Sequence, residues 1–152
     1  MLVLFTLDGD RYGIPVRDVV EITPLVRLKK LPLAPPWVAG LFNYRGGAIP
    51  VLDICRLAGA APCRSRLGTR IIVVRYPQTA AGRPLGVIAE QVTETVRLDE
   101  ADFAPAGLRM EEAPFLGQVA VLPQGIIQRV EVAGLLPENL RRSLFAQAEA
   151  AS

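Results

Sequence analysis

The fold of this chain is decided by the stretch Gly40-Leu41-Phe42-Asn43-Tyr44-Arg45-Gly46-Gly47-Ala48-Ile49-Pro50-Val51-Leu52-Asp53-Ile54, in which two apolar runs flank a pair of glycines. Two apolar runs joined by a glycine turn predict a β-hairpin. Pro50 has no N–H to donate, so we expect the second strand to lie at an edge or to bend there. The one charged residue at the end of the first run, Arg45, raises the question of function.

The composition limits what the rest of the chain can be. With 152 residues, of which 51% are hydrophobic, the chain can form one domain with a substantial core. Thirteen glycines and thirteen prolines favour short strands and turns over long helices. A net charge of +2 is too small to indicate a nucleic-acid surface by itself. The absence of histidine excludes histidine-based triads, histidine phosphoacceptors and histidine-ligated metal sites within the chain.

The start of the chain and its thiols indicate the compartment. The apolar residues 1–7 are followed by Asp8, and the run is too short for a signal peptide or a membrane span. We therefore expect a cytoplasmic protein without direct membrane insertion. Cys55 and Cys63 form no CxxC motif, and we expect them to be reduced and structural. We expect no cofactor and no metal, because no ligand spacing appears.

The remaining segments predict a mainly β chain with short helices. Valines at helical spacing predict one or two helical turns over residues 16–22, and residues 25–31 predict a partly exposed edge strand. Asp53 should cap a short helix over residues 53–57. Residues 59–68 predict a connector, whose arginines could instead bind phosphate. The other predicted elements are strands over 2–7, 11–16, 70–76, 85–88, 93–98, 117–122 and 125–132, and a terminal helix over 137–150.

The second half of the sequence echoes the first, at an offset of 73 to 78 residues. Such self-similarity predicts an internal duplication, here of two small five-stranded β units that close into barrels. We place subdomain one roughly at residues 14–68, and subdomain two at 69–136 together with swapped terminal segments, with 137–152 as the C-terminal helix. The recurring residues are Gly13, Glu21, Gly47 and Asp53 in the first half, and Gly86, Glu94, Gly125 and Glu131 in the second.

The two copies differ at Arg45. With an offset of 77, Arg45 falls opposite Leu122, while Glu21 has a counterpart in Glu94. Only the first unit therefore has both an acid and this arginine. One interpretation is an Arg45–Glu21 pair that shapes a contact surface, because arginine offers a planar fork of donors to a carboxylate. The alternative is an ordinary exposed arginine beside a turn.

At these residues the chain resembles the CheW family of chemotaxis coupling proteins. The most specific match is Asn43-Tyr44-Arg45-Gly46 followed by Ile49-Pro50-Val51-Leu52-Asp53, and the resemblance covers nearly the whole chain. Two departures are Tyr44, where the family usually has leucine, and Ala89-Glu90, where it often has aspartate. The resemblance implies two five-stranded, SH3-like barrel subdomains around a shared core, which agrees with the repeat.

The resemblance also implies a function. CheW-like proteins are non-catalytic adaptors that bind the cytoplasmic hairpin tips of methyl-accepting chemoreceptors and the regulatory domain of a CheA-like histidine kinase, in membrane-associated receptor arrays. Residues 41–46 are similar to those of scaffold proteins in Wsp-like surface-sensing pathways, which control a diguanylate cyclase. Whether the output is motility or cyclic-di-GMP stays open.

The resemblance implies that Glu21 and Arg45 face the receptor, and we expect neighbouring residues to contribute. Phe103 and Leu108 could contact the kinase, or they could fold back onto the core. The full set of expected contact residues is Glu21, Arg45, Val19, Ile22 and Gly46 for the receptor, and Phe103, Leu108 and Gly47 for the kinase.

Other function classes have less support in the sequence. An enzyme would have to use Asp53, Glu21, Glu90 or Cys55, but no nucleophile–base pattern, phosphate loop or metal spacing accompanies them. A small β-barrel module that binds another protein or nucleic acid is the alternative to the adaptor, although only 6% of residues are aromatic. Trp37 could anchor an interface or could be a partly buried packing residue.

Overall fold

Short strands separated by turns make up most of the chain. The computed structural model describes residues 1–77, 79, 82–104 and 113–151. The helices within these ranges are α1 (Ile54–Leu57) and α2 (Glu138–Ala151), with single 3₁₀ turns over Val16–Asp18, Glu100–Asp102 and Val132–Gly134. The strands are β1 (Leu2–Leu7), β2 (Asp10–Pro15), β3 (Val19–Pro24), β4 (Val38–Tyr44), β5 (Gly47–Asp53), β6 (Arg70–Arg75), β7 (Pro84–Val96), β8 (Phe103–Ala104), β9 (Leu116–Leu122) and β10 (Gly125–Val130).

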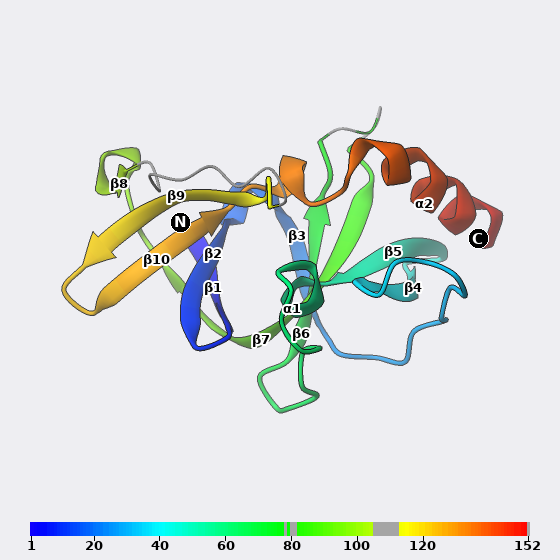
Figure 1. The fold of residues 1–152 in the computed structure, drawn as a ribbon, viewed down its shortest axis with the longest axis horizontal. Helices are drawn as coiled ribbons and strands as arrows, with labels where there is room; N and C mark the ends of the chain where they lie inside the picture. Colours follow the sequence, from blue (N-terminus) through cyan, green and yellow to red (C-terminus); the bar gives the residue numbers. More distant parts are fainter. Residues whose placement is uncertain (78, 80–81, 105–112, 152) are drawn as a thin grey trace.

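The strands pair into two groups that share β7, and the groups lie side by side in Figure 1. Unit one contains β3, β4, β5, β6 and the first half of β7. Unit two contains β1, β2, the second half of β7, β8, β9 and β10. The mainly β fold with two units is thereby confirmed. The division between residues 68 and 69 stays a prediction, and strand pairing crosses it, because β6 pairs with β3.

A single strand, β7, replaces the two strands predicted over residues 85–88 and 93–98. It runs for 13 residues, pairing with β6 in its first half and with β1 in its second. At the changeover Gln91 has a φ of 51°, and the register with β1 shifts between Leu4 and Thr6. The predicted interruption is wrong because this irregularity turns the strand from one unit to the other without ending it.

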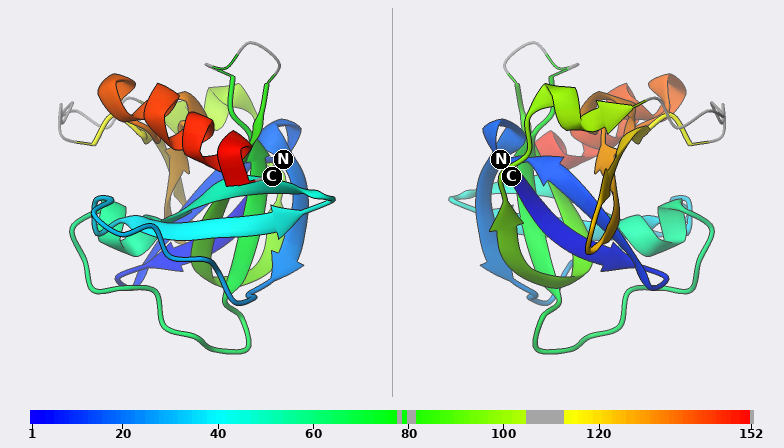
Figure 2. Two further views of the ribbon diagram at one scale, coloured as in Figure 1. Left: turned by 90° about the vertical axis from the view of Figure 1, so that its right-hand side faces the viewer. Right: turned by 90° about the vertical axis from the view of Figure 1, so that its left-hand side faces the viewer.

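One hydrophobic core joins the two units. Phe5 of β1 and Leu52 of β5 belong to the same buried cluster, together with Val74 of β6. The predicted C-terminal helix is confirmed as α2, which packs against β5 and buries Leu144 and Phe145 in this core (Figure 2). Within the described residues, no helix has both the length and the apolar character needed to cross a membrane.

Two local predictions between β2 and β4 are wrong. Only Val16–Asp18 forms a helical turn, whereas Val19–Pro24 is strand β3, paired with β6. The β-branched valines that suggested helical spacing suit a paired strand better. The edge strand predicted over residues 25–31 is reduced to one isolated bridge between Lys29 and Leu41.

The predicted hairpin is confirmed as β4 and β5, with Arg45 and Gly46 as its two turn residues. Their φ values are 50° and 83°, as a type I′ turn requires at both central positions. Tyr44 pairs with Gly47, so Gly47 belongs to the strand rather than to the turn. Pro50 pairs with β4, and the parallel pairing of β5 with β7 begins only at the next residue, which suits a residue without an N–H.

The equivalent hairpin of unit two is β9–β10, and it corrects the alignment of the repeat. Leu122 pairs with Gly125 there, as Tyr44 pairs with Gly47 in unit one. Arg45 therefore corresponds to Pro123, and the offset of 77 was one residue short at this point. Proline cannot replace the guanidinium, so the difference between the two copies remains.

Candidate functional site

The β4–β5 turn places the side chain of Arg45 against Glu21 of β3. Arg45 Nη2 donates a hydrogen bond to Glu21 Oε1 at 2.5 Å, and the Tyr44 hydroxyl donates to the same oxygen at 3.1 Å. The Arg45 guanidinium carbon also lies 5.3 Å from the centroid of the Tyr44 ring, within the range of a cation–π contact. The predicted Arg45–Glu21 pair therefore forms, with Tyr44, the last residue of β4, as a third member. We call these three residues the Arg45 cluster.

The Arg45 cluster is exposed and charged. The Arg45 side chain is 72% accessible to solvent. Hydrogen bonds from Arg45 and then from Tyr44 lower the pKa of Glu21, so its carboxylate is ionised at neutral pH. Partial burial and the hydrogen bond to Glu21 raise the pKa of Tyr44, so its hydroxyl keeps its proton and can donate. Because an exposed ion pair contributes little to stability, the cluster is better suited to shaping a contact surface than to holding the fold.

The other residues predicted to contact the receptor do not lie on one common surface. Gly46 lies exposed in the same turn. Ile22 is exposed, and it lies on the opposite face of β3 from Glu21 because side chains alternate along a strand. Val19 is partly buried and packs against the main core, so it offers less surface than expected. Val20 is exposed and was missed, because the helical interpretation of this segment hid the alternation of a strand.

The predicted kinase residues do not come together. Phe103 lies in β8 of unit two, packs against a cluster that includes Ile127, and has the Arg129 guanidinium carbon 4.5 Å from its ring centroid. This packing is the fold-back arrangement that the sequence left open. Gly47 begins β5 in unit one. Leu108 lies outside the described residues. A kinase contact through these residues stays a prediction.

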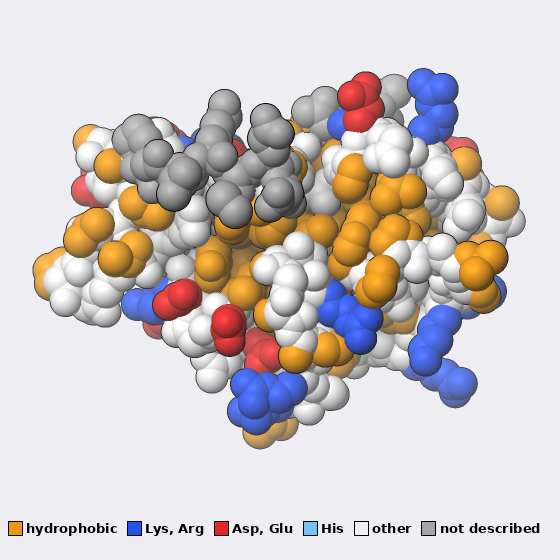
Figure 3. Space-filling view, in the orientation of Figure 1, with side chains coloured by type: hydrophobic (Ala, Val, Ile, Leu, Met, Phe, Trp, Pro, Cys, Tyr) orange, Lys and Arg blue, Asp and Glu red, His pale blue; other side chains and the backbone are white. Residues whose placement is uncertain are grey.

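A second exposed apolar feature lies at the β9–β10 hairpin. Val121 and Ile126 face each other across the two strands, and their exposed fractions are 73% and 59%. Figure 3 shows hydrophobic side chains gathered at this end of the molecule. Such a pair is costly to leave in water, which makes it a candidate contact surface. Both strands are predicted from the sequence, but which of their side chains face outward is seen only in the structure.

Asp53, one of the residues weighed for catalysis, has a local structural role. The Asp53 carboxylate accepts hydrogen bonds from the N–H groups of Cys55 and Arg56, which confirms the predicted cap of α1. It also accepts from the N–H of Cys63, which was not predicted. One Asp53 oxygen and the two thiol sulfurs lie within 4.8 Å of one another, so these three side chains are of types and at distances that could hold a metal ion. Trp37 packs against the main core, which confirms the packing interpretation.

Comparisons with known proteins agree with this architecture. The chain is 28% identical to the chemotaxis protein CheW of Helicobacter pylori over 101 residues, which is 66% of this chain and 59% of that protein. It is 21% identical to the CheW of Bacillus subtilis over 144 residues, or 93% of this chain and 90% of that one. It is 33% identical to the protein FrzA of Myxococcus xanthus over 101 residues, or 66% and 61%. The chain thus spans about three fifths of two of these relatives.

A solved structure and a family model place the chain in a family. The crystal structure of the scaffolding protein TtCheW from Thermoanaerobacter tengcongensis superposes with a TM-score of 0.80 at 27% identity, covering 91% of this chain and 92% of that one. The model of the CheW-like domain matches residues 1–139. Taken with the two β units around one core, these matches show that the chain belongs to the CheW-like domain family.

Proposed function

We propose that this chain is a non-catalytic adaptor that couples methyl-accepting chemoreceptors to a CheA-like histidine kinase in chemosensory arrays. The CheW-like domain over residues 1–139 supports the class of function. The observation that carries the proposal is the exposed Arg45–Glu21 pair, held at 2.5 Å on a turn whose unit-two counterpart lacks an arginine. We place the protein in the cytoplasm, at the membrane-distal tips of the receptors.

The receptor surface combines charge with apolar area on unit one. The Arg45 guanidinium can pair with an acidic side chain of the receptor, while Glu21 holds it in position. Val20 and Ile22 expose apolar area on the same strand as Glu21, with Ile22 on the opposite face from Glu21. Because β3 is the terminal strand in the sheet order, a partner that docks at this edge can reach both faces. A helical hairpin would gain affinity from such apolar area, and the charges would set its register.

The kinase surface is proposed for unit two, so that both partners can bind at once. Val121 and Ile126 supply the apolar area. Phe103 pairs with the buried Ala120, on the opposite face of β9 from Val121, so it supports this surface from the core side rather than forming part of it. Gly47 remains a candidate contact on unit one. An adaptor that holds two partners can change kinase activity only if receptor states differ in how they bind or orient it.

Co-sedimentation with receptor-containing membranes tests the receptor surface. We expect Arg45→Glu to weaken binding by about tenfold, because it places like charge beside Glu21 and toward the receptor. The matched control is Arg142→Glu, which makes the same charge change at an exposed position on α2. The double variant Glu21→Arg with Arg45→Glu should recover part of the binding if the two residues act as a pair. Binding of Arg45→Glu at the wild-type level would show that this surface is not used.

A pull-down with the purified kinase regulatory domain tests the second surface. Wild-type protein should be captured, and Val121→Asp should be lost, while Arg45→Glu should still be captured. Failure of the wild type to bind would favour the alternative, a β-barrel module for another protein or for nucleic acid. Neighbouring receptor, kinase, flagellar or cyclase genes would decide whether the output is motility or, as in Wsp-like pathways, cyclic-di-GMP.

A further inference from the structure

The two cysteines of the chain lie against each other, although eight positions separate them in the sequence. Cys55 is the second residue of α1, and Cys63 lies in the connector that follows this helix. Their Sγ atoms are 2.7 Å apart, and both thiols are free. A disulfide bond is about 2.05 Å long, so the sulfurs have to approach by less than about 1 Å to become bonded.

The contact between the thiols is held by one carboxylate. Asp53 Oδ1 accepts a hydrogen bond from the Cys55 N–H at 3.0 Å, and Asp53 Oδ2 accepts one from the Cys63 N–H at 3.0 Å. Asp53 is itself buried at the end of β5. Because the same side chain holds both cysteine backbones, the connector is kept against the start of α1 with its thiol beside that of Cys55.

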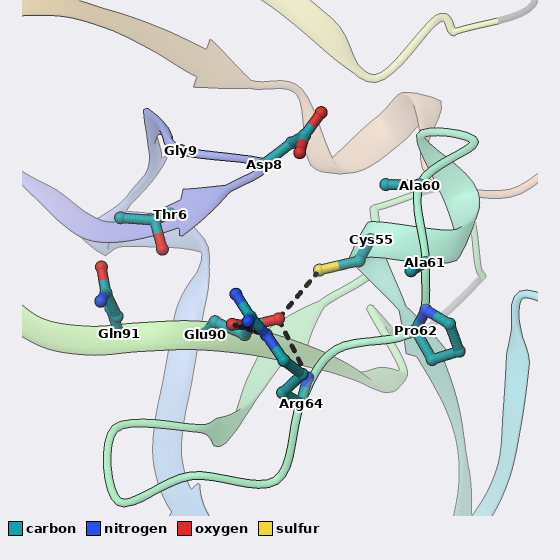
Figure 4. A pocket seen from close by; sticks show the side chains of 10 residues that line it. All are labelled: Thr6, Asp8, Gly9, Cys55, Ala60, Ala61, Pro62, Arg64, Glu90 and Gln91. Carbon is teal, nitrogen blue, oxygen red and sulfur yellow. Dashed lines mark hydrogen bonds and ion pairs between the residues drawn. The ribbon is translucent and has the colours of Figure 1, made fainter.

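The pair is next to an open cleft. Cys55 lines a cleft of about 570 Å³ together with Pro62, Arg64 and Glu90. In Figure 4 the Cys55 thiol points toward Glu90, to whose Oε2 it donates at 3.9 Å, and the Arg64 N–H donates to the same oxygen at 2.9 Å. A volume of this size admits a small molecule. The cleft therefore gives a small reactant access to a thiol that is otherwise buried.

We propose that Cys55 and Cys63 are a redox modification site, which forms a reversible intramolecular disulfide by exchange with a low-molecular-weight disulfide that enters the cleft. In the first step Cys55 passes its proton to Glu90, and its sulfur attacks the small disulfide. The S–S bond of that molecule breaks, and one small thiol leaves with the proton from Glu90. Cys55 is now joined to the other half in a mixed disulfide.

In the second step the Cys63 sulfur attacks the Cys55 sulfur. The bond from Cys55 to the small thiol breaks, and that thiol leaves with the proton of Cys63. The two protein thiols are oxidised to one disulfide, and the small disulfide is reduced to two thiols, so electrons and protons balance. Reduced small thiols reverse both steps.

The surroundings favour a disulfide over a metal ion at this place. Asp53 already uses both of its carboxylate oxygens to accept backbone hydrogen bonds, which leaves it fewer lone pairs for a metal. A metal also requires both thiols as thiolates. The hydrogen bond with Cys55, burial and the hydrogen bond with Asp53 all raise the pKa of Cys63, so this thiol keeps its proton until the second step.

The test treats the full-length protein with glutathione disulfide and counts alkylatable thiols by intact mass. The wild type should change from two alkylatable thiols to none and lose the mass of two hydrogens, with no disulfide between chains. Reductant should restore the two thiols. Its melting temperature should rise by about 5 °C, because the bond closes a short loop. Cys63→Ser should keep one glutathione on Cys55, since the second thiol is missing, whereas Cys55→Ser should be modified far more slowly.

Several results would overturn the proposal. They are two glutathione adducts on the wild type, a disulfide between two chains, unchanged thiols after prolonged treatment, or zinc that co-purifies and protects both thiols from alkylation. The wild-type measurements alone decide between these results, even if a serine variant folds poorly. None of them uses a receptor or a kinase, so the adaptor proposal and the redox proposal can fail separately.

Discussion

Replacing Asp53 with alanine should lower the free energy of unfolding by about 3 kcal/mol, although we assign Asp53 no partner contact. The residue is 7% exposed, and its carboxylate accepts hydrogen bonds from the N–H groups of Cys55, Arg56 and Cys63. Losing the helix cap costs about 1 kcal/mol. Leaving the Cys63 N–H without its acceptor costs about 2 kcal/mol more.

Asp53→Ser separates the two contributions. A serine hydroxyl can cap the first turn of α1, but it is too short to reach the Cys63 N–H as well, so we expect a loss of about 2 kcal/mol. Urea denaturation with an unchanged m-value measures both losses. The control is Asp10→Ala, at an exposed position in β2, which should change stability by less than about 0.5 kcal/mol.

If Asp53→Ala unfolds at the same urea concentration as the wild type, the Asp53 carboxylate does not stabilise the fold in this way. If the serine and alanine variants are equally unstable, the cap contributes nothing. In either case Asp53 would have to be reconsidered as a contact residue.

Three further predictions concern the cluster, the core and the terminal helix. Arg45→Gln should raise the pKa of Glu21 toward its ordinary value, as an NMR titration of the carboxyl group would show. Since the folded-state pKa is lowered, the stabilisation from the pair is present above the ordinary pKa and is lost as pH falls through the folded value. Gly86→Ala should cost about 2 kcal/mol, because a Cβ there would lie 2.9 Å from Val51 Cγ2 and 3.1 Å from Ile71 Cγ2. Gly46→Ala, with open space but a φ of 83°, should cost only about 1 kcal/mol in the same denaturation assay, and the reverse order would contradict the packing. Phe145→Ala should cost about 3 kcal/mol in thermal unfolding, because this buried ring stacks on Tyr76, whereas a loss below about 1 kcal/mol would mean that α2 is peripheral.

The sequence predicted those elements that are determined by residues close together in the chain. The β4–β5 hairpin follows from two apolar runs around Arg45 and Gly46, and the α1 cap follows from Asp53, because both depend on neighbouring residues. Residues 16–22 could not be assigned in this way. Their valines fit either a helix or a strand, and the pairing with β6, about fifty residues further along the chain, decides between the two.

The residue types in the candidate site could be predicted from the sequence, but the contacts that depend on the three-dimensional fold could not. Arg45 and Glu21 were expected together because only the first half has both, and they form the ion pair. The role of Tyr44 depends on a contact between β4 and β3, in which its hydroxyl reaches Glu21, 23 positions earlier in the chain. The contact between Cys55 and Cys63 depends on a connector that folds back onto Asp53, and no spacing rule indicates it.

The shared strand β7 has a mechanical consequence. Its first half is hydrogen-bonded to β6 and its second half to β1, so the same backbone runs through both units. A force that separates the units would therefore load the hydrogen bonds of the β7–β6 and β7–β1 ladders at the same time. Two domains joined by a linker would instead swing about a hinge. Stretched between two anchors, the molecule should rupture in one event, with no earlier extension. A force applied at the Arg45 turn would pass to the β9–β10 hairpin through the paired strands β5, β7, β1 and β2 rather than through a flexible linker.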